Sequence, residues 1–333
     1  MEKVILKGTD LNVTKICLGT GSYGSSFDIT KCPDQLDYFY SKGGNFLDTA
    51  VAYTDWKPGE RSRSEKVIGK WMKERGNRNE IILSAKGCHQ DYLEPTGSAG
   101  TSKMGPLRVN RKAIIEDVEK SLELLQTDYI DIFGLHQDDP DVDVAEIIET
   151  LEEVKKSGKI RYYGCSNWTV ERQRLAYEYA RSKDYEGFIM DQLNWSINKI
   201  NADGLVAEGN VAMNDELYDF HNQTQINVLA YSSSGRGYMQ KRASNLPMRD
   251  TDHEKYDNPQ NELILPALID IANKHKVAVH SVVIKYMTVE RNFTAIPIAS
   301  CRSNEGLDVI LDALNFDFDK EDMTALKAVA QYI

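Results

Sequence analysis

The sequence predicts a (β/α)8 barrel, an α/β fold in which eight parallel strands close into a barrel and helices cover its outside. Eight apolar, strand-like runs alternate with amphipathic stretches at a near-constant spacing, and 333 residues is a common length for this barrel. No linker or shift in composition divides the chain, so we expect one domain over residues 1–333.

The eight runs are rich in β-branched and aromatic residues, which strands favour. In chain order they are KICLGT (15–20), NFLDTA (45–50), EIILSAK (80–86), YIDIFGLH (129–136), IRYYGCSN (160–167), GFIMDQLNW (187–195), INVLAYSS (226–233) and FTAIPIAS (293–300).

The connecting stretches carry apolar residues at the i, i+3, i+4 spacing of a helix with one buried face. This spacing predicts helices most clearly over residues 111–126 and 144–159. The second ends in KKSGK, and basic residues followed by glycine mark a helix C-terminus. Residues 320–333 are also amphipathic and predict an extra C-terminal helix that packs outside the barrel.

Three segments interrupt this alternation. Residues 3–13 predict a small N-terminal β-hairpin, turning at Gly8 and Thr9, that plugs the barrel floor. Long loops are expected at residues 88–109 and 234–260, after the third and seventh strands. Loops that follow barrel strands surround the active face, and loops of this length are either functional lids or disordered segments.

The composition excludes several classes of protein. A net charge of −11 argues against nucleic acid or an anionic membrane as the main partner. The sequence has no signal-like segment and no apolar run of membrane-spanning length. The five cysteines show no Cys-x-x-Cys spacing, which predicts reduced thiols in a cytoplasmic protein and no metal site.

Four polar residues stand where successive apolar runs end: Asp48, Tyr53, Lys86 and His136. If these runs are neighbouring parallel strands, their side chains meet at one face of the barrel, and this set suits proton transfer. Each residue alone is more often structural: a packed rim tyrosine, a solvated lysine, a capping aspartate or a buried histidine. Their occurrence together indicates an enzyme.

Residues 19–24, GTGSYG, offer a competing interpretation, because they match the G-x-G-x-x-G pattern of dinucleotide-binding Rossmann folds. In that fold a helix starts at the glycine loop, so that its N-terminus faces the pyrophosphate. Here SSFDITKCPD separates the glycines from any helical pattern. We therefore expect the glycines to keep the barrel rim low beneath a ligand.

The sequences DTAVAY (48–53), SAKG and DIFGLH together resemble the aldo-keto reductase superfamily. GCSNW at 164–168, Gln192 and AYSSSGRG at 230–237 extend the resemblance over nearly the whole chain. The resemblance implies a barrel enzyme that reduces an aldehyde or ketone to an alcohol with NAD(P)H.

This resemblance also implies roles for the four polar residues. Tyr53 would donate a proton to the alkoxide that hydride transfer leaves. A free phenol has a pKa of about 10, so we expect Lys86 beside it to stabilise the phenolate, with Asp48 holding the lysine in place. His136 would orient the carbonyl or share the proton.

The same motifs imply which residues bind the cofactor. Ser166, Asn167 and Gln192 match the residues that hold the nicotinamide carboxamide, and Tyr231 matches the aromatic residue that stacks on the nicotinamide ring. The other positions are Thr20 and Gly21 near the nicotinamide, Ser232, Ser234, Gly235 and Arg236 around the pyrophosphate, and Ser300 and Arg302 at the phosphate end.

The turn after the eighth strand departs from the family pattern, since Val309 and Ile310 stand where a Glu-Asn pair usually binds adenine. Arg302 is the only cation in this turn, and a guanidinium suits a phosphate. We therefore expect NADPH, with NADH as the alternative.

Aromatic residues near strand ends are expected to form a substrate pocket for a small carbonyl or alcohol, with a moderately polar, sugar-like compound as one candidate. The alternative is that half of them are ordinary packing between barrel and helices. The pocket residues expected are Tyr23, Trp56, His89 and Trp168.

Two other functions stay open. One is a non-catalytic NADPH-binding regulatory subunit of the same fold, against which the four catalytic-type residues weigh. The other is a lyase that uses Lys86 as a Schiff-base amine, which requires an uncharged lysine, whereas Asp48 would keep it charged. The sequence leaves the physiological substrate, the direction of reaction and the oligomeric state open.

Overall fold

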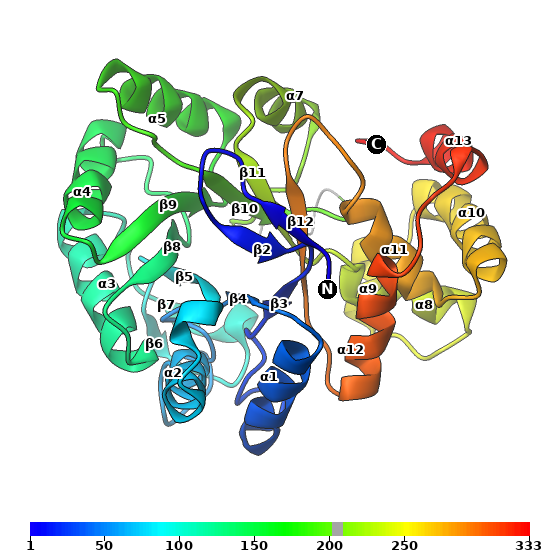
Figure 1. Cartoon of the computed structure of the whole chain (residues 1–333), viewed down its shortest axis with the longest axis horizontal. Coiled ribbons are helices and arrows are strands. Elements are labelled where there is room, and N and C mark those ends of the chain that lie inside the picture. Colours follow the sequence, from blue (N-terminus) through cyan, green and yellow to red (C-terminus); the bar gives the residue numbers. More distant parts are fainter. Residues whose placement is uncertain (202–208) are drawn as a thin grey trace.

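The computed structural model describes residues 1–201 and 209–333, and its centre is a closed barrel of eight parallel strands (Figure 1). The predicted fold class is confirmed, and each barrel strand lies within the run predicted for it, except that β5 extends one residue beyond its run to Gly87. Around the barrel they are β3 (Cys17–Gly19), β4 (Phe46–Asp48), β5 (Ile82–Gly87), β8 (Ile130–Leu135), β9 (Ile160–Ser166), β10 (Met190–Asn194), β11 (Asn227–Tyr231) and β12 (Ala295–Ala299).

Helices surround this barrel (Figure 1), and most of the longer ones begin at an Asn, Asp, Ser or Thr whose side chain caps free backbone N–H groups. They are α1 (Cys32–Ser41), α2 (Arg63–Arg75), α3 (Arg111–Leu125), α4 (Val144–Lys156), α5 (Val170–Ser182), α7 (Asp215–Thr224), α8 (Tyr238–Ala243), α9 (Asp250–Tyr256), α10 (Pro259–His275), α11 (Val279–Met287), α12 (Asn304–Leu311) and α13 (Lys320–Val329).

The two helices predicted from their spacing are present as α3 and α4. Helix α4 ends three residues before the predicted boundary, because the chain leaves the helix at Ser157 and Gly158 has a φ of +80°. Helix α13 packs outside the barrel as predicted, with Leu326 fully buried and Lys274 of α10 paired to Asp322 at 2.9 Å.

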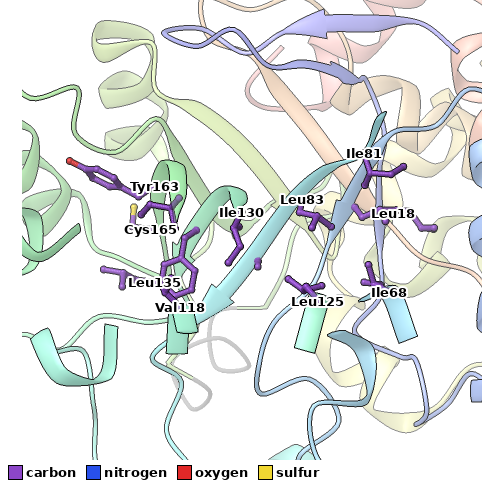
Figure 2. Packing of buried hydrophobic residues seen from close by; sticks show 14 of the residues in the cluster. Leu18, Ile68, Ile81, Leu83, Val118, Leu125, Ile130, Leu135, Tyr163 and Cys165 are labelled. Atoms are coloured by element: carbon purple, nitrogen blue, oxygen red, sulfur yellow. The ribbon is translucent and has the colours of Figure 1, made fainter. Parts of the chain in front are cut away.

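Apolar side chains fill the layer between barrel and helices. Figure 2 shows Leu18 and Leu83 from strands gathered with Ile68 of α2 and Leu125 of α3. Full burial of one such side chain contributes roughly 1.5–3 kcal/mol. A Cβ at Gly69 of α2 would lie 2.3 Å from the Leu124 carbonyl oxygen, so only glycine allows α2 and α3 to approach this closely.

The N-terminal hairpin closes the floor of the barrel, as predicted. Strands β1 (Lys3–Ile5) and β2 (Asn12–Thr14) pair antiparallel and turn through Gly8, whose φ is +75°. Apolar side chains of the hairpin are buried against residues at the N-terminal ends of the barrel strands, and the hairpin lies across the barrel in Figure 1. The hairpin residues involved are Leu6, Leu11 and Val13.

The two expected long loops contain secondary structure. Residues 88–109 include a two-stranded hairpin of β6 (Tyr92–Glu94) and β7 (Lys103–Met104). The prediction of a loop over residues 234–260 is wrong, because helices α8 and α9 and the start of α10 occupy it. Tyr238, Met239 and Tyr256 anchor these short helices in a buried cluster. In the described ranges, no helix is long and apolar enough to cross a membrane.

Candidate active site

Three neighbouring strands bring the four polar residues together. Asp48 is the last residue of β4, Lys86 lies near the end of β5, and His136 directly follows β8. Strand β5 pairs with both β4 and β8, so these strand ends meet on one side of the barrel. Tyr53 reaches the same place from the turn after β4.

Asp48 is the shared partner within this group. Its Oδ1 accepts a hydrogen bond from Lys86 Nζ at 2.5 Å, and its Oδ2 accepts one from the Tyr53 hydroxyl at 2.9 Å. Lys86 Nζ also donates to the Thr49 carbonyl oxygen at 2.8 Å. Because the side chains of Asp48 and Lys86 are each only 1% exposed, each charge depends on the other for compensation.

The surroundings of Tyr53 differ in one respect from the expectation. Its hydroxyl donates to Asp48, while Lys86 Nζ lies 4.9 Å from the centroid of its ring. Burial and then the charge of Asp48 raise the pKa of Tyr53 well above its usual value. This arrangement favours the protonated phenol rather than the phenolate, which is the form that a proton donor needs.

His136 lies on the other side of Tyr53, with the two rings edge to face and their centroids 5.7 Å apart. Its Nδ1 is buried and has no hydrogen-bond partner within residues 1–201 and 209–333. Burial, followed by the neighbouring His89 and Lys86, lowers the pKa of His136 well below its usual value. The imidazole is therefore neutral and can donate one hydrogen bond.

Hydroxyl groups behind Asp48 fix its backbone. Thr20 Oγ1 donates to the Asp48 carbonyl oxygen at 2.7 Å and lies 2.6 Å from Ser64 Oγ, which also contacts Thr49 Oγ1 at 2.9 Å. Thr20 is fully buried and supports Asp48 through this bond. Contact between Thr20 and the cofactor stays a prediction.

A cavity of about 840 Å³ extends from Asp48 and Tyr53 across the barrel rim. At Gly21, a Cβ would lie 3.4 Å from the Tyr53 ring, so glycine keeps the cavity open beside the tyrosine. This agrees with a low rim beneath a ligand. Expected cofactor residues that line the cavity are Gly21, Tyr231, Ser232, Ser234, Arg236, Ser300 and Arg302.

The residues expected around the nicotinamide come from the neighbouring strands β9, β10 and β11 and from the turn after β9. Ser166 pairs with Gln192 across β9 and β10. Asn167 Oδ1 accepts from the Tyr231 hydroxyl at 2.7 Å, and its Nδ2 donates to Ser166 Oγ at 3.1 Å. The structure thus places the four residues expected around the nicotinamide on adjoining strands, with three of them linked by hydrogen bonds. Gly235, which was expected near the pyrophosphate, is buried and does not line the cavity. A Cβ at this position would lie 2.4 Å from Asn198 Nδ2.

Positive charge gathers at the outer part of the cavity. Arg236, Lys241 and Arg249 all approach the carboxylate of Asp252, at 3.5, 3.2 and 2.7 Å. Asp252 is buried, which alone would raise its pKa, but its bonds to Arg249 and Lys241 hold the pKa well below the usual value. Arg302 lines the same cavity, is exposed and forms no ion pair with any described residue.

Lys241 and Arg249 were missed by the sequence reasoning. The basic residues at 241–242 and Arg249, in the segment after the seventh strand, could have indicated positive charge near the cofactor site. Because that segment was expected to be an irregular loop, nothing placed these cations at the cavity.

Two of the expected substrate-pocket residues are core residues. Tyr23 is fully buried, and its hydroxyl donates to Gln35 Oε1 at 3.1 Å. Trp168 is also fully buried, with its Nε1 donating to the Gln137 carbonyl oxygen at 3.2 Å. Both rings pack in the apolar layer between barrel and helices and do not line the cavity at Asp48 and Tyr53, and their contact with a substrate stays a prediction.

The other two, Trp56 and His89, join a row of rings that leads away from Tyr53. His89 lies edge to face with His136 at 4.8 Å and stacks on Tyr92 at 5.4 Å, and Tyr92 meets Trp56 at 6.1 Å. The row connects the proposed proton donor with the hairpin loop after β5. Over residues 1–201 and 209–333, no group of three His, Cys, Asp or Glu side chains is arranged to hold a metal ion.

Comparisons with known proteins bear on this site. Residues 15–331 match the Aldo/keto reductase family. Norsolorinic acid reductase stcV of Emericella nidulans is 26% identical over 97% of this chain and 79% of its own length. The NADP(+) aryl-alcohol dehydrogenase of Phanerodontia chrysosporium is 31% identical, over 59% of this chain and 51% of its own length.

A solved structure has the same fold. The thermostable aldo-keto reductase Tm1743, in complex with the inhibitor epalrestat, superposes with a TM-score of 0.69 at 22% identity. The superposition covers 99% of this chain and 100% of the other.

Proposed function

The chain belongs to the aldo/keto reductase family of NAD(P)-dependent oxidoreductases, and from this premise we propose that it reduces aldehydes or ketones to alcohols with NADPH. One observation carries the proposal: Tyr53 and Asp48, which are bonded to each other and through Asp48 to Lys86, line the same cavity as four cationic side chains. A reductase needs a proton donor and a site for a phosphate-bearing dinucleotide, and here one cavity supplies both.

The cavity suits a dinucleotide in chemistry as well as in size. Its volume of about 840 Å³ is within the usual range for ligand sites. Tyr231 offers a flat ring in the cavity. Asn167, bonded to the Tyr231 hydroxyl, and Ser166 and Gln192 on the neighbouring strands carry groups that can bind a carboxamide. At the outer end, Arg236, Lys241, Arg249 and Arg302 would neutralise the phosphates of NADPH.

In the proposed reaction NADPH supplies the hydride, and the protein supplies the proton and the orienting groups. The neutral His136 donates a hydrogen bond to the carbonyl oxygen of the substrate. Tyr53 donates its hydroxyl proton to that oxygen as negative charge develops there. Lys86, 4.9 Å from the ring centroid, would stabilise the resulting phenolate by its charge.

We further propose that the carbonyl group of the substrate is attached to an aromatic ring. An uncharged row of rings begins at the proposed proton donor and leads away from it, through Tyr53, His136, His89, Tyr92 and Trp56. A relative named as an aryl-alcohol dehydrogenase supports this choice. This proposed substrate differs from the sugar-like compound that was one candidate from the sequence.

The test is an NADPH fluorescence titration followed by turnover of a panel of aryl aldehydes, aryl ketones and aldoses. We expect NADPH binding and its oxidation with aryl carbonyls in preference to aldoses. Binding of NADPH without oxidation by any member of the panel would favour the non-catalytic subunit instead. Failure of NADPH to bind would contradict the proposal itself.

The free thiols agree with a reducing compartment, and we propose a cytoplasmic location on this basis. Cys17, Cys32, Cys88 and Cys165 are buried and unpaired, and Cys301 is partly exposed and unpaired.

A further inference from the structure

His280 is an imidazole in the wall of the cofactor cavity that the proposed reaction does not use. It lies in the first turn of α11, is half-buried, and lines the same cavity as Tyr53 and Arg302. A Cβ added at Gly237, another residue of this wall, would lie 3.8 Å from His280 Nδ1. The ring therefore borders the space that a bound cofactor would fill.

The ring nitrogens of His280 are available to a ligand. The backbone N–H of His280 donates to Gln240 Oε1 at 3.0 Å. Neither ring nitrogen forms a hydrogen bond or an ion pair with any residue in the described ranges. Neither belongs to the fully enclosed polar atoms that lack a partner, so both reach accessible space.

The state of the imidazole indicates which part of a dinucleotide it suits. Burial lowers the pKa of His280 to about 4, so the ring is uncharged at neutral pH. A neutral imidazole offers one donor and one acceptor but no charge to pair with a phosphate. Arg236 and Lys241 already supply positive charge to this cavity. His280 therefore suits an uncharged part of NADPH, which is either the nicotinamide or the adenine.

The packing of α11 distinguishes between these two bases. Gln240, which holds the backbone of His280, precedes Lys241 in α8. The hydroxyl of Ser281 donates to the Val309 carbonyl oxygen of α12 at 2.7 Å. The turn that carries His280 is thus fixed between the two segments that flank the cationic part of the cavity. The groups expected around the nicotinamide come instead from β9, β10 and β11.

We propose that His280 recognises the adenine base of the cofactor through a hydrogen bond between its imidazole and the edge of the base. This inference rests on the proposed use of NADPH. The edge of adenine carries an amino donor and ring-nitrogen acceptors, which a neutral imidazole complements. Val309 and Ile310, which replace the Glu-Asn pair that usually binds adenine, are aliphatic and do not line the cavity. His280 supplies the polar contact that this chain lacks there.

The experiment measures the Kd values of NADPH, NADH and reduced nicotinamide mononucleotide by fluorescence titration. NADPH and NADH share the adenine and differ in the 2′-phosphate, whereas the mononucleotide lacks the whole adenosine part. The variants are His280→Phe, which keeps a flat ring without a hydrogen-bonding group, and His280→Gln, whose amide offers a donor and an acceptor. The matched control is His253→Phe, at an exposed position of α9 outside the cavity.

We expect His280→Phe to raise the Kd of NADPH and of NADH by the same factor, about three- to tenfold, the value of one neutral hydrogen bond. His280→Gln should restore both affinities, and His253→Phe should bind like the wild type. The Kd of the mononucleotide should not change. Unchanged Kd values for both dinucleotides in His280→Phe would overturn the inference. A loss confined to NADPH would also overturn it, because His280 would then contact the 2′-phosphate.

The mononucleotide separates recognition of the base from damage to the cavity. If His280→Phe weakens the mononucleotide as well, the comparison passes to His280→Leu, which lacks both the ring and the hydrogen-bonding groups. Weaker binding of the mononucleotide in both apolar variants would overturn the inference, since His280 would then support the cavity rather than bind the base. If the wild type binds neither dinucleotide, the proposed function fails instead.

Discussion

Asp48 is the residue on which the proposed chemistry depends. It compensates the buried charge of Lys86 and accepts the hydroxyl of Tyr53, while Thr20 fixes its backbone from behind. A buried ammonium without such a partner is strongly destabilising. The same bonds orient the phenol, so stability and proton donation rely on one carboxylate.

Arg302 tests the cofactor choice at the residue scale. If it binds the 2′-phosphate, Arg302→Ala should weaken NADPH while leaving NADH nearly unchanged. A hydrogen bond to a charged group contributes roughly 1.5–3 kcal/mol, so the Kd for NADPH should rise about one to two decades. Fluorescence titrations with both cofactors measure this difference.

Arg181→Ala is the matched control for that comparison, since Arg181 is an exposed arginine on α5, remote in sequence from the cavity. Equal losses for NADPH and NADH in Arg302→Ala would indicate a general defect. A wild-type preference for NADH would overturn the cofactor proposal while leaving the reductase proposal in place.

Elements differ in how well the sequence predicts them. The barrel strands are found because each is a short apolar run between polar connections, as in KICLGT or NFLDTA. Helices α8 and α9 are missed because six or seven residues offer too few turns for a periodic pattern. Their positions depend on where Tyr238 and Tyr256 can be buried, which is a property of the folded chain.

The packing of α2 on α3 contains an ionisable group and predicts a pH effect on stability. Glu65 of α2 is fully buried, and its Oε1 accepts from Ser121 Oγ of α3 at 2.9 Å. Its Oε2 has no hydrogen-bond partner in the described part of the chain. Burial raises the pKa of Glu65 from 4.5 to about 8. Folding therefore takes up a proton, and the stability from this group falls as pH rises from about 4.5 to about 8.

Glu65→Gln keeps an acceptor for Ser121 but cannot ionise. Each unit of pKa shift corresponds to about 1.4 kcal/mol, so at pH 8 the variant should exceed the wild type by a few kcal/mol in its free energy of unfolding. At pH 5 the difference should be small. Urea unfolding at both pH values tests this, with Glu74→Gln, an exposed position on the same helix, as the control. Parallel pH dependence of wild type and Glu65→Gln would refute the assignment.

For the molecule as a whole, charge is distributed unevenly. The chain carries a net charge of −11, yet Arg236, Lys241, Arg249 and Arg302 line one cavity. A local concentration of cations in an acidic protein draws a polyanionic ligand to that place rather than to the surface at large. This distribution supports a phosphate-bearing cofactor better than a neutral one.

The sequence predicts those residues of the candidate site that stand at the ends of strands or within a recognisable motif. Asp48, Lys86 and His136 could be placed because parallel strands end on one face. Whether an aromatic ring near a strand end points into the barrel mouth could not be predicted. Tyr23 and Trp168 turn outward beneath helices, and that choice depends on packing between elements far apart in the chain.

The central claim is that Tyr53 donates the proton in a reduction carried out with bound NADPH. The most direct test is the single-turnover rate of NADPH oxidation with an aryl aldehyde, for wild type, Tyr53→Phe and the control Tyr40→Phe. General acid catalysis typically contributes about 10²–10⁴-fold, so Tyr53→Phe should bind NADPH with similar affinity but react slower by that factor. Tyr40→Phe, at an exposed hydrogen bond to Glu80, should react like the wild type. An unchanged rate in Tyr53→Phe would contradict the account.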